Sequence, residues 1–283
     1  MTALSPVYQK HHLRGIGGSM KRISANIFAV LVLALTLAAC QTVPYTGRSQ
    51  FLMTSKAQED QLGEDAWREV CAKEKKCTNQ QYNEALLRVG TSIAQISGQS
   101  DFKWEFRVFQ SKEANAFCLP GGKVAVYSEL FKLAANDAEL ASVVGHEIGH
   151  AIARHGGERM SQAAVQSAGL QVVSAATKGN TAWTQAYGIA TEVGGMLPYS
   201  RLHEYEADYI GLMLMAKAGY DPNAAISFWN KFKTVGSSGP FGEFFSTHPM
   251  SEKRIEEMRL KMPEAINLYN KCPNKKGLGV RYR

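Results

Sequence analysis

The 283-residue sequence predicts a mostly helical α+β protein, and two observations support this. Over most of the chain, apolar residues recur at helical spacing between turn signals. Residues 101–127 instead have strand patterns: apolar and charged side chains alternate from Phe102 to Val108, and a Pro-Gly-Gly turn at 120–122 divides two short extended segments. A composition of 45% apolar and 20% charged residues is ordinary for a globular protein.

The N-terminus has the pattern of an export signal. The apolar run Ile27–Ala39 follows Lys21 and Arg22, as the h-region of a signal peptide follows its n-region. The run ends in Leu-Ala-Ala-Cys, which resembles the bacterial lipobox and would leave Cys40 lipidated. An uncleaved membrane anchor is the alternative, but the run is shorter than the roughly 20 residues that a spanning helix needs. We expect a lipoprotein-type signal peptide at 1–39, with Met20 as an alternative start, and the lipidated Cys40 and a tether at 40–54.

Charge and cysteine content limit the possible partners. Residues 1–39 hold 4 of the 32 basic residues and no acidic one, so 28 basic residues remain against 25 acidic ones and no nucleic-acid partner is indicated. Residues 266–283 are expected to form a basic tail. Four further cysteines in an exported chain predict two disulfides of open connectivity, since no C-x-x-C pair supports a cysteine zinc site: Cys71, Cys77, Cys118 and Cys272.

The elements of the remaining chain can be read in order. The Ala-, Gly-, Ser- and Gln-rich region 160–198 predicts two thinly packed helices that end at Pro198, and residues 237–249 read as a loop. Either Ser128 or Asn136 can cap the third helix. The other helices are expected at residues 55–74, 80–98, 136–154, 200–218, 223–232 and 252–262, and a small hairpin at 115–127.

The third helix contains the pattern H-E-x-x-H at His146, Glu147 and His150. Side chains four apart share a helix face, so both imidazoles can bind one ion, and the geometry suits zinc. A catalytic zinc ion usually takes three protein ligands, so one more donor is needed. The metzincin extension fails, because Ala153 and Gly156 stand where that pattern requires Gly and His.

A later helix supplies carboxylates. Glu204 and Asp208 are four apart, so Glu204 can bind zinc while Asp208 accepts a hydrogen bond from a zinc-bound histidine. Glu206 points roughly 160° away from this face and is a poor ligand. The alternative is a solvated acidic face. The sequence therefore predicts one Zn²⁺ per chain, held by His146, His150 and Glu204.

Five segments resemble, in order, the signature of the HtpX, CaaX-protease and mitochondrial Oma-type family of zinc metallopeptidases, and its lipoprotein members in particular. The resemblance covers residues 102–259. It implies a gluzincin with a zincin-like domain at 55–265, in which a small antiparallel sheet packs beside the motif helix. The same three zinc ligands are implied. The segments are NAFCLPGGKVAVYSELF, DAELASVVGHEIGHAIARH, SRLHEYEADYIG, AGYDP and THPMSEKR.

Catalytic roles follow from the motif and the resemblance together. Glu147 is expected to take a proton from zinc-bound water as that water attacks a peptide carbonyl. The family's T-H-P block makes His248 and Arg254 candidates for stabilising the tetrahedral intermediate, with His203 and Tyr205 as weaker alternatives. The segment Asn115, Ala116 and Phe117 is expected to be an exposed sheet edge that pairs with an extended peptide.

These roles predict an endopeptidase for unfolded or misassembled envelope proteins. The alternative is a zinc-containing chaperone or assembly factor for outer-membrane proteins that works with their assembly machinery and cuts little. Gln41 after the lipidated cysteine favours an anchor on the periplasmic face of the outer membrane. A further hypothesis is self-inhibition, with residues 160–198 covering the cleft and His248 replacing water on zinc.

Overall fold

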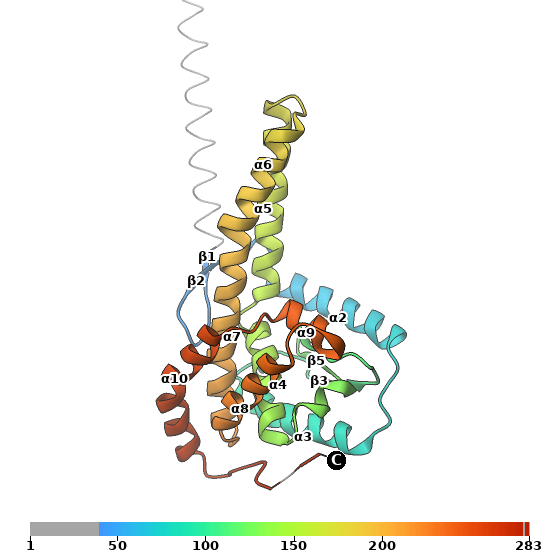
Figure 1. The fold of residues 1–283 in the computed structure, drawn as a ribbon, viewed down its shortest axis with the longest axis vertical. Helices are drawn as coiled ribbons and strands as arrows, with labels where there is room; N and C mark the ends of the chain where they lie inside the picture. The colour runs from blue at the N-terminus through green and yellow to red at the C-terminus, as the bar shows by residue number, and fades with distance from the viewer. Residues whose placement is uncertain (1–39, 280, 283) are drawn as a thin grey trace, which may run out of the picture.

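The computed structural model describes residues 40–279 and 281–282, so the predicted signal peptide lies outside the described residues. Figure 1 shows a body of helices around a small sheet, from which a long hairpin of two helices projects. Within the described ranges, no helix is both long and apolar enough to cross a membrane. The structure thus agrees with the predicted mostly helical α+β class.

The segment predicted as a tether is folded. Strands β1 (Cys40–Thr42) and β2 (Ser49–Phe51) form an antiparallel hairpin, and Val43 between them is buried. The hairpin is fixed to the body because Arg48 forms ion pairs with buried carboxylates of two helices. The sequence shows only a polar segment here, because the partners of Arg48 lie more than 100 residues away.

The next helices begin and end close to their predicted positions. Helix α2 (Lys56–Lys73) starts with a capping box between Ser55 and Gln58, and α3 (Gln80–Ile96) starts at Asn79, whose side chain accepts from the Tyr82 amide. The sheet follows, with strands β3 (Glu105–Phe109), β4 (Ala116–Leu119) and β5 (Lys123–Tyr127).

The sheet is mixed, whereas an antiparallel sheet was expected. Its strand order is β3-β5-β4; β4 and β5 pair antiparallel, but β3 pairs parallel to β5. The chain leaves β3, makes the outer strand β4, and turns back at Gly121 and Gly122 so that β5 inserts between the two. Both glycines have positive φ, at 79° and 90°, which suits this turn.

The motif helix α4 (Asp137–Ile152) is buried along its whole length and is capped by Asn136, which accepts from the Glu139 amide. Ser128 instead opens a short 3₁₀ helix, Ser128–Lys132. Helix α7 (Leu197–Lys217) crosses α4 at a pair of glycines. A Cβ on Gly211 would lie 2.6 Å from the His146 amide nitrogen, so only glycine permits this close approach. The approach brings the acidic residues of α7 beside the motif.

The projecting hairpin consists of α5 (His155–Ala176) and α6 (Thr181–Thr191), and it confirms the two helices predicted at 160–198 (Figure 1). A π-helical turn at Glu192–Met196 runs into α7, and Pro198 lies in the first turn of α7 instead of ending a helix before a gap. The hairpin is thinly packed: Val172 and Trp183 remain 68% and 63% exposed.

The C-terminal part is more ordered than the sequence suggested. The predicted loop holds a 3₁₀ turn (Gly239–Phe241) and α9 (Gly242–Thr247), between α8 (Asn223–Val235) and α10 (Glu252–Lys271). Helix α10 passes its predicted end at Met262, with Pro263 inside it. The basic tail packs on the body through Tyr282, whose hydroxyl donates to Asp137 Oδ1 at 2.7 Å.

The predicted disulfides are wrong, since all four of these thiols are free. Cys77 and Cys118 lie in or against the main core, and Cys71 packs beside Trp67. Cys272 caps the end of α10. The even count of cysteines does not predict pairing here, because folding places the four residues in α2, in the α2–α3 connection, in β4 and at the end of α10. The core itself centres on the packing of α4, α7 and α8, with fully buried Leu140, Ile148, Ile210, Phe228, Trp229 and Phe232.

Candidate metal centre

Four side chains converge beside the motif helix: His146 and His150 from α4, Glu204 from α7, and His248 from the end of α9. Their donor atoms all lie within 4.8 Å of one another. The Nε2 atoms of His146 and His150 are 3.1 Å apart. They lie 3.4 Å and 3.3 Å from the two carboxylate oxygens of Glu204. His248 Nδ1 is 3.2 Å from Glu204 Oε2 and 3.3 Å from His146 Nε2.

These spacings match the edges of a coordination tetrahedron. Bonds of about 2.0–2.1 Å from zinc to nitrogen or oxygen separate tetrahedral donors by roughly 3.3–3.4 Å. His146 contacts Asp208 Oδ1 through Nδ1 at 2.9 Å, so its neutral ring presents only a lone pair at Nε2. Two imidazole lone pairs that face each other repel unless a metal ion or a shared proton lies between them. The donor set of this chain therefore fits Zn²⁺.

Electrostatics favour a cation in the same place. Burial lowers the pKa of His146, but hydrogen bonds with Asp208 and Glu204 outweigh burial and raise it to about 9. Burial raises the pKa of Glu204, yet the neighbouring His150 and the hydrogen bonds of the surrounding imidazoles hold it well below its usual value. Buried carboxylates thus stay ionised around the cluster, and their field attracts positive charge.

Arg254 is buried against two carboxylates at the metal centre. Its Nε and Nη2 each lie 2.8 Å from an oxygen of Asp208, and its Nη1 is 2.9 Å from Glu204 Oε2 and 3.0 Å from the Pro249 carbonyl. The residue is only 3% exposed. Three of these four contacts hold carboxylates: two hold Asp208 beside the cluster and one holds Glu204 within it. Its expected role of stabilising a reaction intermediate stays a prediction.

Glu147 lies next to the cluster without belonging to it. Its side chain is buried, and among the described residues its Oε1 has no hydrogen-bond partner. His248 Nε2 is 3.5 Å from this atom. Burial raises the pKa of Glu147. A carboxylate oxygen without a hydrogen-bond donor, beside a metal site, is available to accept a proton.

The predicted peptide-binding segment lies on the outer strand of the sheet. Strand β4 packs against α4 and pairs with β5 on one edge only. The Asn115 side chain contacts Glu243 of α9 at 3.3 Å, and its backbone carbonyl accepts from the Tyr127 amide. The structure therefore brings Asn115, Ala116 and Phe117 to a sheet edge near the motif helix. The weaker candidate His203 lies behind His155, on which its ring stacks, and contacts Glu158 at 2.9 Å.

Sequence reasoning missed His155 and Glu206. His155 Nδ1 is 2.8 Å from His150 Nδ1, and His155 Nε2 is 3.0 Å from Glu206 Oε2. The contact between His150 and His155 depends on Arg154. This residue adopts a left-handed conformation with φ of 54° and interrupts the helical backbone between α4 and α5. Nothing in the local sequence signals that break, because a non-glycine residue is uncommon in this conformation.

Comparisons with known proteins agree with this geometry. The model of peptidase family M48 matches residues 80–261, which is more than half of the chain. The chain belongs to peptidase family M48. This membership supports the predicted metallopeptidase class and its zincin-like fold.

The relatives that the chain resembles are named as proteases. The chain is 37% identical over 227 residues to "Mitochondrial metalloendopeptidase OMA1" of Schizosaccharomyces pombe, covering 79% of this chain and 66% of the relative. It is 39% identical over 174 residues to the Saccharomyces cerevisiae protein of that name, covering 59% and 49%. It is 28% identical over 257 residues to "Beta-barrel assembly-enhancing protease" of Escherichia coli, covering 84% and 52%. This M48 chain thus spans 49–66% of the length of these relatives.

The predicted location is wrong. The relatives with 34–39% identity are named as mitochondrial proteins of two fungi and of Arabidopsis thaliana. They contradict an anchor on the periplasmic face of the outer membrane. The motifs that led to that prediction lie at residues 1–41: the apolar run, the cysteine at its end and Gln41. Lipidation of Cys40 stays a prediction.

Proposed function

We propose that this M48 chain is a zinc-dependent endopeptidase that cleaves unfolded or misassembled polypeptides. The observation that carries the proposal is the set of convergent donors with a buried carboxylate oxygen beside it. His146, His150 and Glu204 would hold the ion. A bound zinc ion would acidify a water molecule and polarise the carbonyl group of the peptide.

The protein's own groups supply the proton transfers. No described residue donates a hydrogen bond to Glu147 Oε1, so this atom can accept the proton of the attacking water and return it to the leaving amine nitrogen. Its raised pKa, which results from burial, brings its proton affinity closer to that of the groups it serves. Asp208 accepts a hydrogen bond from Nδ1–H of His146, and this bond directs Nε2 of that ring toward the ion.

The sheet edge supports the proposed substrate class. An extended segment can add to the outer edge of β4 through main-chain hydrogen bonds, beside α4 and its motif. Such pairing reads an extended backbone and makes few demands on side chains. Folded proteins do not offer a free extended segment, so unfolded polypeptides are the expected substrates.

His248 supports a resting state in which access to the ion is limited. Its Nδ1 completes the group of four donors, at the corner that a catalytic site leaves to water. The far part of the α5–α6 hairpin projects from the body (Figure 1), so we assign this cover to His248 and not to the hairpin. The resting state therefore depends on the segment after α9, and displacing His248 would open the site.

The test compares Glu147→Gln with the wild-type chain, both loaded with zinc. Loss of a general base costs about 10²–10⁴-fold in rate, so cleavage of unfolded casein should fall by at least that lower factor while one zinc per chain remains. Glu252→Gln, at an exposed position on α10, serves as the matched control. Casein cleavage by Glu147→Gln at the wild-type rate would contradict the proposal. A zinc-loaded wild-type chain that binds unfolded protein without cutting it would favour the chaperone alternative.

A further inference from the structure

The two histidines of the motif are oriented by different partners, and the partner of His150 has no place in the proposed chemistry so far. His150 turns Nε2 toward the donor cluster, 3.1 Å from His146 Nε2. Its other nitrogen, Nδ1, lies 2.8 Å from His155 Nδ1. A metal ligand needs its coordinating nitrogen unprotonated, so the ring proton of neutral His150 must be on Nδ1.

This proton fixes the tautomer of the next ring. A hydrogen bond between two imidazole nitrogens contains one proton, so His155 Nδ1 accepts and the proton of neutral His155 is on Nε2. That atom lies 3.0 Å from Glu206 Oε2, which accepts it. His155 is completely buried and Glu206 is 5% exposed, so water does not compete for either bond.

The chain of hydrogen bonds ends on a compensated charge. Arg48 of the β1–β2 hairpin donates to Glu206 Oε2 from Nε at 2.9 Å and from Nη2 at 2.8 Å. Thr46 of the same hairpin donates to the other oxygen of Glu206. Glu206 thus has enough donors to remain a buried carboxylate, as an acceptor for His155 requires.

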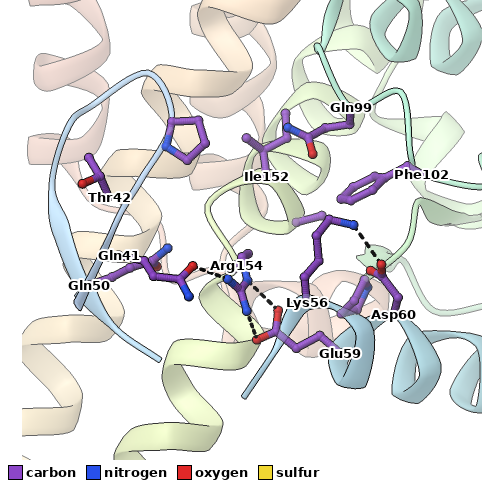
Figure 2. A pocket seen from close by; sticks show the side chains of 13 residues that line it. Gln41, Thr42, Gln50, Lys56, Glu59, Asp60, Gln99, Phe102, Ile152 and Arg154 are labelled. Atoms are coloured by element: carbon purple, nitrogen blue, oxygen red, sulfur yellow. Dashed lines mark hydrogen bonds and ion pairs between the residues drawn. The ribbon is translucent and has the colours of Figure 1, made fainter. Parts of the chain in front are cut away.

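The fold builds this contact with a specific corner. In an uninterrupted helix His155 would lie about 140° around the axis from His150. The left-handed Arg154 lets α5 start in a new direction and returns His155 to His150. Figure 2 shows Arg154 held in place by Gln41 and by Glu59, whose two oxygens lie 2.9 Å from its guanidinium nitrogens.

We propose that His155 and Glu206 are positioning residues of the metal centre, which orient His150 and tie it to the N-terminal hairpin through Arg48. This inference rests on the proposed function, because it assumes that His150 binds an ion. Loss of a hydrogen-bonded partner behind a metal-bound histidine typically weakens metal binding 10–100-fold. The same order of effect is expected here.

The experiment uses the full chain and three variants. His155→Phe removes both hydrogen bonds and keeps a ring, whereas the Gln side chain in His155→Gln can still accept from His150 and donate to Glu206. His203→Gln is the matched control, because His203 is also completely buried and stacks on His155 with ring centroids 4.1 Å apart. Zinc affinity is measured by competition with a chromophoric chelator, and the visible spectrum of the Co²⁺-loaded protein reports ligand geometry.

We expect His155→Phe to weaken zinc binding by roughly 10–100-fold and to change the cobalt spectrum. His155→Gln should recover most of the affinity, and His203→Gln should keep the wild-type spectrum even if its apo form unfolds more easily. If His155→Phe does not fold, Glu206→Gln decides, with weakened zinc binding expected. Wild-type zinc affinity and a wild-type cobalt spectrum in His155→Phe would overturn the inference. If His155→Phe does not fold, the same result in Glu206→Gln would overturn it.

The result separates this inference from the proposed function. A zinc-loaded wild-type chain that cleaves casein, together with unaltered metal binding in the His155 variants, overturns only the positioning role. A wild-type chain that binds no zinc overturns both.

Discussion

The two sides of the metal centre orient one histidine each, by different means. His146 is backed directly by a carboxylate, Asp208, at 2.9 Å, and that carboxylate is held by the buried Arg254. His150 is backed by a second imidazole, His155, and only then by a carboxylate.

The residues that hold the two histidines come from different parts of the fold. The Asp208 side is built from α7 and α10, near neighbours in a dense core. The other side runs from α4 across α5 and α7 to Arg48 in the N-terminal hairpin, where the guanidinium side chain is still 17% exposed. One support is short and fully buried, and the other is long and reaches the surface. Damage to the first should therefore cost more.

The largest effect is expected for Asp208→Asn. Among the described residues it leaves the buried Arg254 with Glu204 as its one remaining carboxylate partner, and breaking such a buried pair costs about 3–5 kcal/mol. Zinc affinity should also fall by roughly 10–100-fold. Glu206→Gln is the matched change on the other side and should cost less, since Arg48 keeps Glu158. Denaturant unfolding of both variants gives the order, and equal or reversed losses would contradict the comparison.

The close crossing of α4 and α7 serves both sides, and Gly211→Ala tests it. The added Cβ would lie 2.6 Å from the His146 amide nitrogen and 2.8 Å from the Gly145 carbonyl carbon. Overpacking of this kind costs about 1–3 kcal/mol. Gly156→Ala is the control, because nothing lies within 4 Å of its added Cβ. Its free energy of unfolding should stay unchanged or rise slightly, and an equal loss in both variants would refute this account.

A smaller loss of stability is expected when acid protonates Glu158, which pairs with Arg48 at the outer end of the His150 support. Burial raises the pKa of Glu158, but hydrogen bonds from His203 and Arg48 outweigh it and lower the pKa to about 2. The stabilisation of the folded state by ionised Glu158 is therefore complete above the ordinary pKa of about 4.5. It is lost as pH falls toward 2, by roughly 1 kcal/mol per pH unit. Glu158→Gln should lack this part of the pH dependence. Identical acid profiles for the wild type and Glu158→Gln would contradict the assignment.

The smallest effect concerns the fourth donor, which belongs to neither support. His248→Ala removes a side chain that competes with water for the site, so cleavage of casein should rise by at least about twofold. Ser246→Ala, at an exposed position on α9, is the control. Activity of His248→Ala equal to or below that of the wild type would remove His248 as a restraint.

The sequence predicted the short support and missed the long one for a physical reason. His146, Glu204 and Asp208 follow from helix periodicity, which is local and regular. His155 depends on the left-handed Arg154, and Arg48 depends on carboxylates more than 100 residues away. Neither condition leaves a local pattern in the sequence.

The same distinction explains the fold. Helices α2, α3, α4 and α8 were predicted close to their bounds, since caps and apolar spacing specify them. The parallel pairing of β3 with β5 and the packing of the tail at Tyr282 arise from contacts between distant segments. The prediction of disulfides was wrong for the same reason, because a count of cysteines gives no information about the distances between them.

The most direct test of the metal centre is X-ray absorption at the zinc edge on the wild-type chain and on Glu204→Gln. The account predicts a first shell of four nitrogen and oxygen donors at about 2.0–2.1 Å, with imidazole scattering, and loss of stoichiometric zinc in the variant. Sulfur donors in the first shell, or an unchanged spectrum with full zinc occupancy in Glu204→Gln, would contradict it.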